Sequence, residues 1–256
     1  MNHWNEPLPN TGSLSDTEYL SNTVSLSNTE FLSNRVSFSN AESLSVTESL
    51  SNAGKKVGIL GGTFDPIHTG HLILAEAAYD AYQLDELLIM PSGHSYLKDN
   101  RAQKVQPAPV RYEMVCEAVA DNPHFTASDF ELRRAGNTYT CETLRQLRGQ
   151  HPENSYYFIV GADTITSILT WKDPEEIFSS CTLLAAMREN DVPAEDFLRE
   201  VEHLRREYGA RIRLLEIPAI GISSTDIRNR VKSGRTVHYL VPDRVERYII
   251  ENGIYR

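Results

Sequence analysis

From Lys55 to the C-terminus, short apolar runs alternate with longer amphipathic stretches, and this alternation restricts the range of folds more than any other feature. Apolar runs of roughly four to eight residues predict buried strands, and apolar residues spaced at helical intervals predict helices. The predicted strands lie near Lys56–Leu60, Glu86–Met90, Phe125–Ser128, Tyr156–Val160, Cys181–Met187 and Ile212–Ile217. The predicted helices cover His71–Gln83, Pro109–Ala120, Tyr139–Gly149, Pro174–Ser179, Ala194–Tyr208, Ser223–Lys232 and Pro242–Asn252. We therefore expect an α/β, Rossmann-like domain over residues 55–256, with a doubly wound, mostly parallel sheet and helices on both faces.

The first 54 residues have a different texture. A six-residue repeat rich in Ser, Asn, Thr and Glu runs from Ser13 to Gly54, with leucine at every sixth position except where Phe38 replaces it. Six residues advance a helix by about 600°, so successive leucines fall on different faces and form no apolar stripe. Seven copies are also too few to bury the core of a β-helix. We predict that residues 1–54 form a low-complexity, disordered tail.

The overall charge and the cysteines narrow the classes of function. A formal net charge of −10 argues against coating of nucleic acid or binding to an anionic membrane. Three widely spaced cysteines suggest neither a disulfide framework nor a zinc cluster. The chain begins without a signal-peptide pattern, and no apolar run approaches the length of a membrane span. We expect a cytoplasmic protein without nucleic-acid or membrane partners. The sequence leaves open whether the protein forms a homo-oligomer.

The stretch "GILGGTFDPIHTGH" joins the first predicted strand to the first predicted helix. Gly61 and Gly62 allow the backbone to approach a phosphate closely. His68 and His71 are three residues apart, so they converge near a helix start, where anions are favoured, and Thr69 is the expected N-cap. A turn with structural histidines is the plain alternative. Zinc is the rival ligand, but the HExxH pattern is missing, so we predict a phosphate site and no protein-bound metal.

A second polar motif, "GISSTDIRNRV", follows the last predicted strand and opens another helix. Ser223 or Ser224 suits the N-cap, and the remaining hydroxyls and N–H groups suit phosphate oxygens. Arg228 adds a fixed, forked positive charge. Taken alone, the motif fits a capped surface helix with a solvated arginine equally well. Together with the histidine motif, it predicts a second clamp on one polyphosphate.

These motifs and three further segments occur in an order that is similar to a known family. The further segments are "NTYTCETLRQL", "FIVGADTITSILTWKDPEEIF" and "YLVPDRVERYIIENGIYR". All five together resemble the nucleotidyltransferase superfamily with the (H/T)xGH signature, and most closely the bacterial nicotinate-nucleotide adenylyltransferases. The resemblance covers most of residues 55–256 and leaves the repeat outside.

The resemblance implies transfer of the adenylyl group of ATP to nicotinate mononucleotide, with Mg²⁺ bridging phosphate oxygens. The implied catalytic residues are His68, His71 and Arg228. The implied ATP-binding residues are Gly61, Gly62, Thr63, Phe64, His68, His71, Gly161, Asp163, Ile222, Ser223, Ser224, Thr225 and Arg228. The implied mononucleotide-binding residues are Lys98, Tyr139, Thr140 and Trp171. By themselves, Thr140 and Asp163 could equally cap helices, and Trp171 could pack in the core.

Two departures from the family pattern concern the acceptor. The family usually reads P-N-x-x-P-P-H-K after the second strand, whereas this chain reads "PSGHSYLKD" and keeps only Lys98. Lys172 also replaces the usual tyrosine after the tryptophan. Selectivity between the acid and amide mononucleotides is therefore left open. The alternatives are an adenylyltransferase for nicotinamide mononucleotide or phosphopantetheine, and a non-catalytic nucleotide-binding protein.

Overall fold

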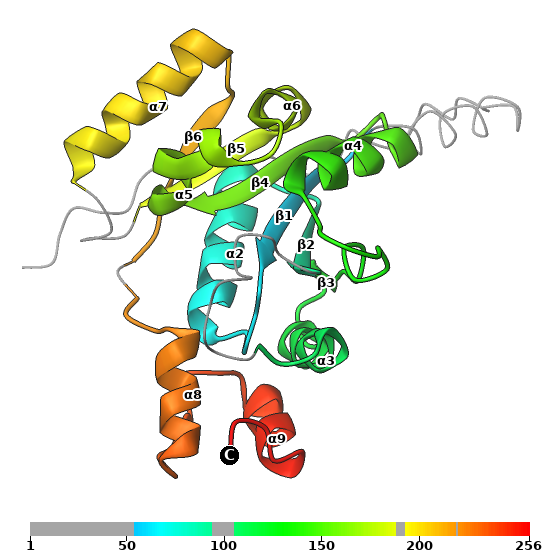
Figure 1. Cartoon of the computed structure of the whole chain (residues 1–256), viewed down its shortest axis with the longest axis vertical. Coiled ribbons are helices and arrows are strands. Elements are labelled where there is room, and N and C mark those ends of the chain that lie inside the picture. The colour runs from blue at the N-terminus through cyan, green and yellow to red at the C-terminus, as the bar shows by residue number, and fades with distance from the viewer. Residues whose placement is uncertain (1–53, 94–104, 188–192, 219) are drawn as a thin grey trace, which may run out of the picture. The chain divides into compact units, whose positions relative to one another are not determined.

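The structure is a computed structural model that describes residues 54–93, 105–187, 193–218 and 220–256. The predicted disordered tail lies outside the described residues except for Gly54, and so does Lys98. Figure 1 shows the described elements as a central sheet with helices packed around it.

The six predicted strands are all present and form one parallel sheet in the order β3-β2-β1-β4-β5-β6. Their bounds are β1 Lys56–Gly62, β2 Glu86–Pro91, β3 Phe125–Ala127, β4 Ser155–Gly161, β5 Thr182–Met187 and β6 Ile212–Glu216. The chain moves outward from β1 to β3 and then returns to place β4 beside β1. The order of the strands therefore reverses between β1 and β4, which is where ligands bind in doubly wound sheets.

Two layers of helices flank the sheet. One layer contains α2 (Thr69–Tyr82) and α3 (Ala108–Val119) and continues beyond the sheet, at the bottom of Figure 1, with α8 (Ser224–Lys232) and α9 (Asp243–Glu251), where α9 packs beside α3. The other contains α4 (Thr140–Gln150), α5 (Ala162–Ser167), the short 3₁₀ helix η2 (Ile168–Thr170), α6 (Pro174–Ser180) and α7 (Ala194–Tyr208). The predicted doubly wound α/β fold is confirmed. The periodicity did not mark α5 and η2, because helices this short have too few turns to show an apolar stripe.

Alternation along the strands explains the two layers. Leu60 and Ile159 are buried in the core that faces α2 and α3, whereas their neighbours Ile59 and Phe158 are buried in the core that faces α4 and α7. Successive side chains of a strand point to opposite faces, and in a sheet covered on both sides each face must be apolar. The central strands therefore read as continuous apolar runs, which is why the sequence marked them clearly.

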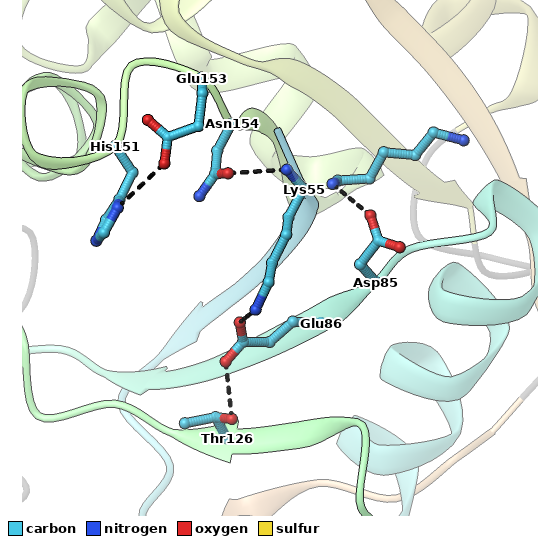
Figure 2. A network of polar contacts seen from close by, with 8 residues as sticks. Lys55, Asp85, Glu86, Thr126, His151, Glu153 and Asn154 are labelled. Atoms are coloured by element: carbon cyan, nitrogen blue, oxygen red, sulfur yellow. Dashed lines mark hydrogen bonds and ion pairs between the residues drawn. The ribbon is translucent and has the colours of Figure 1, made fainter. Parts of the chain in front are cut away.

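The amino ends of the strands are joined by polar side chains (Figure 2). The backbone N–H of Lys55 donates to Asn154 Oδ1 at 2.8 Å, and that of Lys56 donates to Asp85 Oδ2 at 2.8 Å. Lys55 Nζ lies 3.7 Å from Glu86 Oε2. These contacts attach the first described residues to the amino ends of the neighbouring strands, which is the end of the sheet opposite to the predicted ligand site. Within the described ranges, no helix is both long and apolar enough to cross a membrane.

Candidate active site

A cavity of about 680 Å³ opens at the carboxyl ends of β1 and β4, where the strand order reverses. Leu60 to Thr63 form one side of it, and Phe158 to Gly161 form another. The first turns of α2 and α5 also contribute, through His71 and Asp163. The remaining lining residues are Leu74, Met90, Ser92, Glu131, Thr138, Tyr139, Thr140, Thr164, Ser167, Trp171, Lys172 and Ala186. The cavity therefore collects residues from most of the predicted motifs at one place.

The loop between β1 and α2 is compact because the side chain of Phe64 packs against the backbone of the same loop. Phe64 is buried and has a positive φ of 49°, which bends the chain directly after the strand. A Cβ at Gly62 would lie 2.9 Å from the Phe64 ring, so the folded loop accepts no larger residue there without a shift. Gly61, Gly62 and Thr63 line the cavity, whereas Phe64 is buried and does not line it. The Phe64 side chain thus packs within its own loop, and its contact with a ligand stays a prediction.

The two histidines converge at the start of α2, as their spacing predicted. Their rings are stacked with centroids 3.6 Å apart, and the Phe64 ring meets His71 edge-on at 5.0 Å. His71 lines the cavity, whereas His68 is 3% exposed and lies behind it. The backbone N–H of His68 donates to His71 Nδ1 at 3.2 Å. This bond orients the His71 ring so that its opposite nitrogen is directed away from the helix backbone.

The prediction that Thr69 caps α2 is wrong. The N-cap is His68, and Thr69 is the first helical residue. The hydroxyl of Thr69 instead donates to the carbonyl oxygen of Tyr239 at 3.1 Å, and its N–H donates to that of Leu240 at 2.9 Å. A capping box formed by two histidines takes the place of the usual hydroxyl cap.

The second motif lies against the first although more than 150 residues separate them. Ser223 is the N-cap of α8 and accepts the N–H of Asp226 at 3.2 Å, as predicted. Ser224 Oγ donates to the carbonyl oxygen of Pro66 at 2.9 Å. Arg228 Nη1 donates to the carbonyl oxygen of Asp65 at 2.7 Å, and its Nη2 donates to Thr225 Oγ1 at 3.2 Å.

The contacts of this motif reach the outer side of the β1–α2 loop rather than the cavity. Ile222 packs against the core on the α2 side, and Arg228 is half-buried. None of the residues Ile222 to Thr225, nor Arg228, lines the cavity. The structure therefore brings the two motifs together, and it shows α8 holding the turn that carries the histidines.

The predicted mononucleotide residues other than Lys98 line the opposite part of the cavity. Tyr139 is the N-cap of α4, Thr140 is its first residue, and Trp171 follows η2. Lys172 Nζ lies 4.2 Å from the centre of the Tyr139 ring and 2.7 Å from Glu142 Oε1. The hydrogen bond to Glu142 raises the pKa of Lys172, and the same bond lowers the pKa of Glu142. Lys172, which replaces the usual tyrosine, thus adds a positive charge at the rim of this part.

Several residues of the site were not found from the sequence. Glu131 lines the cavity, and its Oε2 is 3.4 Å from the backbone nitrogen of Gly93 while its Oε1 accepts the Thr143 hydroxyl at 2.8 Å. Arg111 is 4% exposed and donates to the carbonyl oxygens of cavity residues. Neither belongs to a glycine-rich or hydroxyl-rich motif, so no local signal marked them.

Among the residues that the structure describes, the acidic side chains that line the cavity do not form a cluster of three metal ligands. Among the described residues, the grouping of three potential metal ligands is His238, Asp243 and Glu246, and these do not line the cavity. The described carboxylates that do line it are Asp163 and Glu131. Such a cavity suits Mg²⁺ that arrives with a polyphosphate, because Mg²⁺ usually keeps several waters and takes few protein ligands.

Comparison with known proteins shows which family the chain is similar to. Residues 59–230 match the model of the family described as cytidylyltransferase-like. A probable nicotinate-nucleotide adenylyltransferase of Moorella thermoacetica is 44% identical over 205 residues, which cover 78% of this chain and 92% of the relative. A second protein of that name, from Lachnoclostridium phytofermentans, is 40% identical over 201 residues, covering 78% of this chain and 99% of the relative.

Solved structures support the fold. The nicotinic acid mononucleotide adenylyltransferase of Plasmodium falciparum, complexed with NaAD, superimposes with a TM-score of 0.65 at 19% identity, covering 78% of this chain and 97% of that one. A nicotinate-nucleotide adenylyltransferase structure from Vibrio parahaemolyticus superimposes with a TM-score of 0.56 at 21% identity, covering 79% of this chain and 96% of that one. At such identities the likeness concerns the fold alone.

Proposed function

The chain belongs to the cytidylyltransferase-like family and, within it, to the nicotinate-nucleotide adenylyltransferases, and from this premise we propose that it joins ATP to nicotinate mononucleotide. The products are nicotinate adenine dinucleotide and pyrophosphate. The observation that carries the proposal is one cavity whose lining includes the glycine loop and His71 together with Tyr139, Thr140 and Trp171. A cavity of about 680 Å³ lies within the range of small-molecule sites.

The reaction needs alignment more than proton transfer. A phosphate oxygen of the mononucleotide attacks the α-phosphorus of ATP, and the bond from that phosphorus to the bridging oxygen of pyrophosphate breaks. The attacking oxygen is already anionic, so no general base is required. The site must hold two anions in line and stabilise the charge that develops on the leaving group.

We assign the polar groups of the cavity to these tasks. The N–H groups of Gly61, Gly62 and Thr63 and the ring of His71 donate to the phosphates of ATP. His68 supports His71 from below through the stacked rings. Arg228 contributes its charge from the far side of the turn. The proposed acceptor contacts are Tyr139, Thr140 and Trp171, with Trp171 offering an aromatic face to the pyridine ring.

Mg²⁺ accompanies ATP in this proposal. Asp163 offers a carboxylate in the cavity, and the phosphates and waters supply the other ligands. When bound, the ion neutralises phosphate charge as pyrophosphate departs. A cytoplasmic setting is proposed as well, since none of the three cysteines, all of which the structure describes, forms a disulfide.

An acceptor panel tests the function. The full chain is incubated with ATP, Mg²⁺ and one of three acceptors, which are nicotinate mononucleotide, its amide and phosphopantetheine, and release of pyrophosphate is measured. We expect the fastest release with nicotinate mononucleotide. A higher kcat/KM with the amide or with phosphopantetheine would replace the proposed acceptor. Binding of ATP without turnover on any acceptor would favour a non-catalytic role.

A further inference from the structure

Arg111 is a buried arginine of α3, and each of its three side-chain nitrogens donates to a backbone carbonyl group. Its Nε donates to the carbonyl oxygen of Gln106 at 3.0 Å. Its Nη1 donates to that of Thr63 at 2.7 Å, and its Nη2 donates to that of Ser92 at 2.9 Å. The residue is 4% exposed, so it touches neither solvent nor the cavity. Burying a charge this deeply costs free energy unless the charged group is hydrogen-bonded and paired with an opposite charge.

The hydrogen bonds from Nη1 and Nη2 of Arg111 join two different segments that line the cavity. Thr63 belongs to the loop after β1, and Ser92 belongs to the loop after β2. Both residues line the cavity. The fork of the guanidinium therefore sets the separation between two walls of the site, since its nitrogens have a fixed planar geometry.

Fixing a carbonyl group also fixes the N–H group of the same peptide unit. In a trans peptide the C=O and the N–H point in opposite directions. The Ser92 carbonyl points at Arg111, and the N–H of the same unit, on Gly93, points at Glu131 Oε2 at 3.4 Å. This peptide unit is thus held between a buried guanidinium and a carboxylate of the cavity. By the same geometry, the Thr63 contact turns the Phe64 N–H away from Arg111.

The surroundings of Arg111 stabilise this arrangement. The buried carboxylate of Asp65 accepts the Tyr255 hydroxyl at 2.6 Å and the N–H of Gln106 at 3.4 Å. Burial lowers the pKa of Arg111, and the nearby Asp65 opposes that shift. The backbone at Gly93 also packs closely against its neighbours, because an added Cβ there would lie 2.7 Å from Thr138 Cγ2 and 2.8 Å from the Glu131 carbonyl oxygen. Ser92 and Gly93, the described residues that directly follow β2, are therefore positioned from both sides.

We propose that Arg111 is a positioning residue for adenylyl transfer, which ties the loop after β1 to Ser92 at the end of β2 and so sets the distance and angle between the two substrates. The proposal rests on the proposed function. An arginine needed only for folding would be indifferent to the alignment of substrates. Arg111 instead acts on the step in which two bound anions must meet in line, where a displacement of about 1 Å can cost on the order of a hundredfold in rate.

The test compares Arg111→Lys with Arg205→Lys. Arg205 is a matched control because its Nη2 also donates to a backbone carbonyl, that of Ile212 at 2.8 Å, and it does not line the cavity. Arg111→Lys keeps a positive charge near Asp65 but loses the forked geometry. We measure kcat from pyrophosphate release, binding of each substrate alone by calorimetry with a non-hydrolysable ATP analogue or nicotinate mononucleotide, and the melting temperature.

We expect kcat of Arg111→Lys to fall about 10-fold to 100-fold while the dissociation constant of each single substrate changes less than about threefold. Arg205→Lys keeps the kcat of the parent. A folded Arg111→Lys protein with kcat within about threefold of the parent overturns the proposal, and so does a loss that appears only in substrate binding.

If Arg111→Lys does not fold, Arg111→Gln takes its place, because the amide keeps one N–H donor without a charge. The same split between kcat and binding is expected, and parental kcat in the folded variant overturns the proposal. If neither variant folds, Arg111 is a determinant of folding and the proposal fails. A parent protein that releases no pyrophosphate with any acceptor contradicts the proposed function instead, and this result is obtained before any variant is compared.

Discussion

The two ends of the parallel sheet are both rich in polar groups, but they are built in different ways. At the amino end, Lys55 and Glu86 meet through side chains that are 61% and 31% exposed, as Figure 2 shows. At the carboxyl end, the 5% exposed Asp65 and the 4% exposed Arg111 act inside the protein and mostly on backbone groups. Water screens the first set and is excluded from the second.

This difference in exposure predicts which polar contacts can be lost at little cost in stability and which cannot. An exposed ion pair contributes about 0–1 kcal/mol, because solvent competes with each partner. A buried charge that loses its partner costs several times as much, since nothing replaces the lost contact. We therefore expect substitutions at the amino end to leave the protein largely unchanged and substitutions at the carboxyl end to alter activity, stability or both.

The largest expected effect is that of His71→Ala. We expect kcat for pyrophosphate release to fall by about 100-fold or more, because a donor to developing charge is lost, while ATP still binds. His151→Ala is the matched control, since this histidine lies just before β4 at the amino end and contacts the exposed Glu153. A loss of less than about threefold in His71→Ala would remove this residue from the mechanism.

Tyr255→Phe should have the next largest effect, and it acts on stability. The hydroxyl of Tyr255 donates to the buried Asp65, and burial together with this bond raises the pKa of Tyr255, so the group stays a donor. Removing a hydrogen bond to a charged group costs about 1.5–3 kcal/mol in the free energy of unfolding. Urea denaturation measures this difference.

The control for Tyr255→Phe is Tyr156→Phe at the other end of the sheet. The Tyr156 hydroxyl is also buried, but it donates at 2.9 Å to a neutral carbonyl oxygen, that of Leu147. Its loss should cost only about 0.5–1.5 kcal/mol. Equal losses in the two variants would mean that the charge of Asp65 has no special role in the β1–α2 loop.

A smaller effect is expected for Glu86→Gln at the amino end. This change removes the ion pair with Lys55 and keeps a side chain that can accept the Thr126 hydroxyl, which lies 3.0 Å away. The free energy of unfolding should fall by less than about 1 kcal/mol, and kcat should not change. A drop of more than about 2 kcal/mol in urea denaturation would show that the two ends are less different than their exposure indicates.

The smallest expected effect is that of removing the repeat. Replacing Met1–Gly54 by a single start methionine should leave kcat and the melting temperature nearly unchanged, since the predicted tail has no apolar stripe to bury. The comparison uses calorimetric melting and pyrophosphate release, with the full chain as reference. A large fall in either quantity would show that the repeat packs against the catalytic domain.

Local patterns predicted much of the site but not its internal arrangement. Gly61, Gly62 and His71 face the cavity because they lie at the end of a strand and the start of a helix. Both the strand end and the helix start could be predicted from the sequence. His68 was predicted beside His71 and lies there, but behind the cavity wall. Its role and that of Arg228 in binding phosphate stay predictions.

The errors and omissions arise from contacts between distant segments. Thr69 was expected to cap α2, yet its hydroxyl bonds to Tyr239, a residue 170 positions later. Arg111 and Tyr255 carry no local motif, and their importance comes only from the carbonyls and the carboxylate that the fold brings to them. Propensity and spacing describe neighbours in the chain and cannot identify such partners.

The sequence by itself determined the order of the strands and of the longer helices, because apolar periodicity acts over a few residues. The family was indicated by the resemblance of its motifs. Only the tertiary structure decided that Ser224 and Arg228 hold the carbonyls of Pro66 and Asp65 and that Arg111 joins two loops of one cavity. The physical reason is range: a hydrogen bond depends on positions within about 3 Å. Those positions are set by the packing of the whole sheet and its two helical layers.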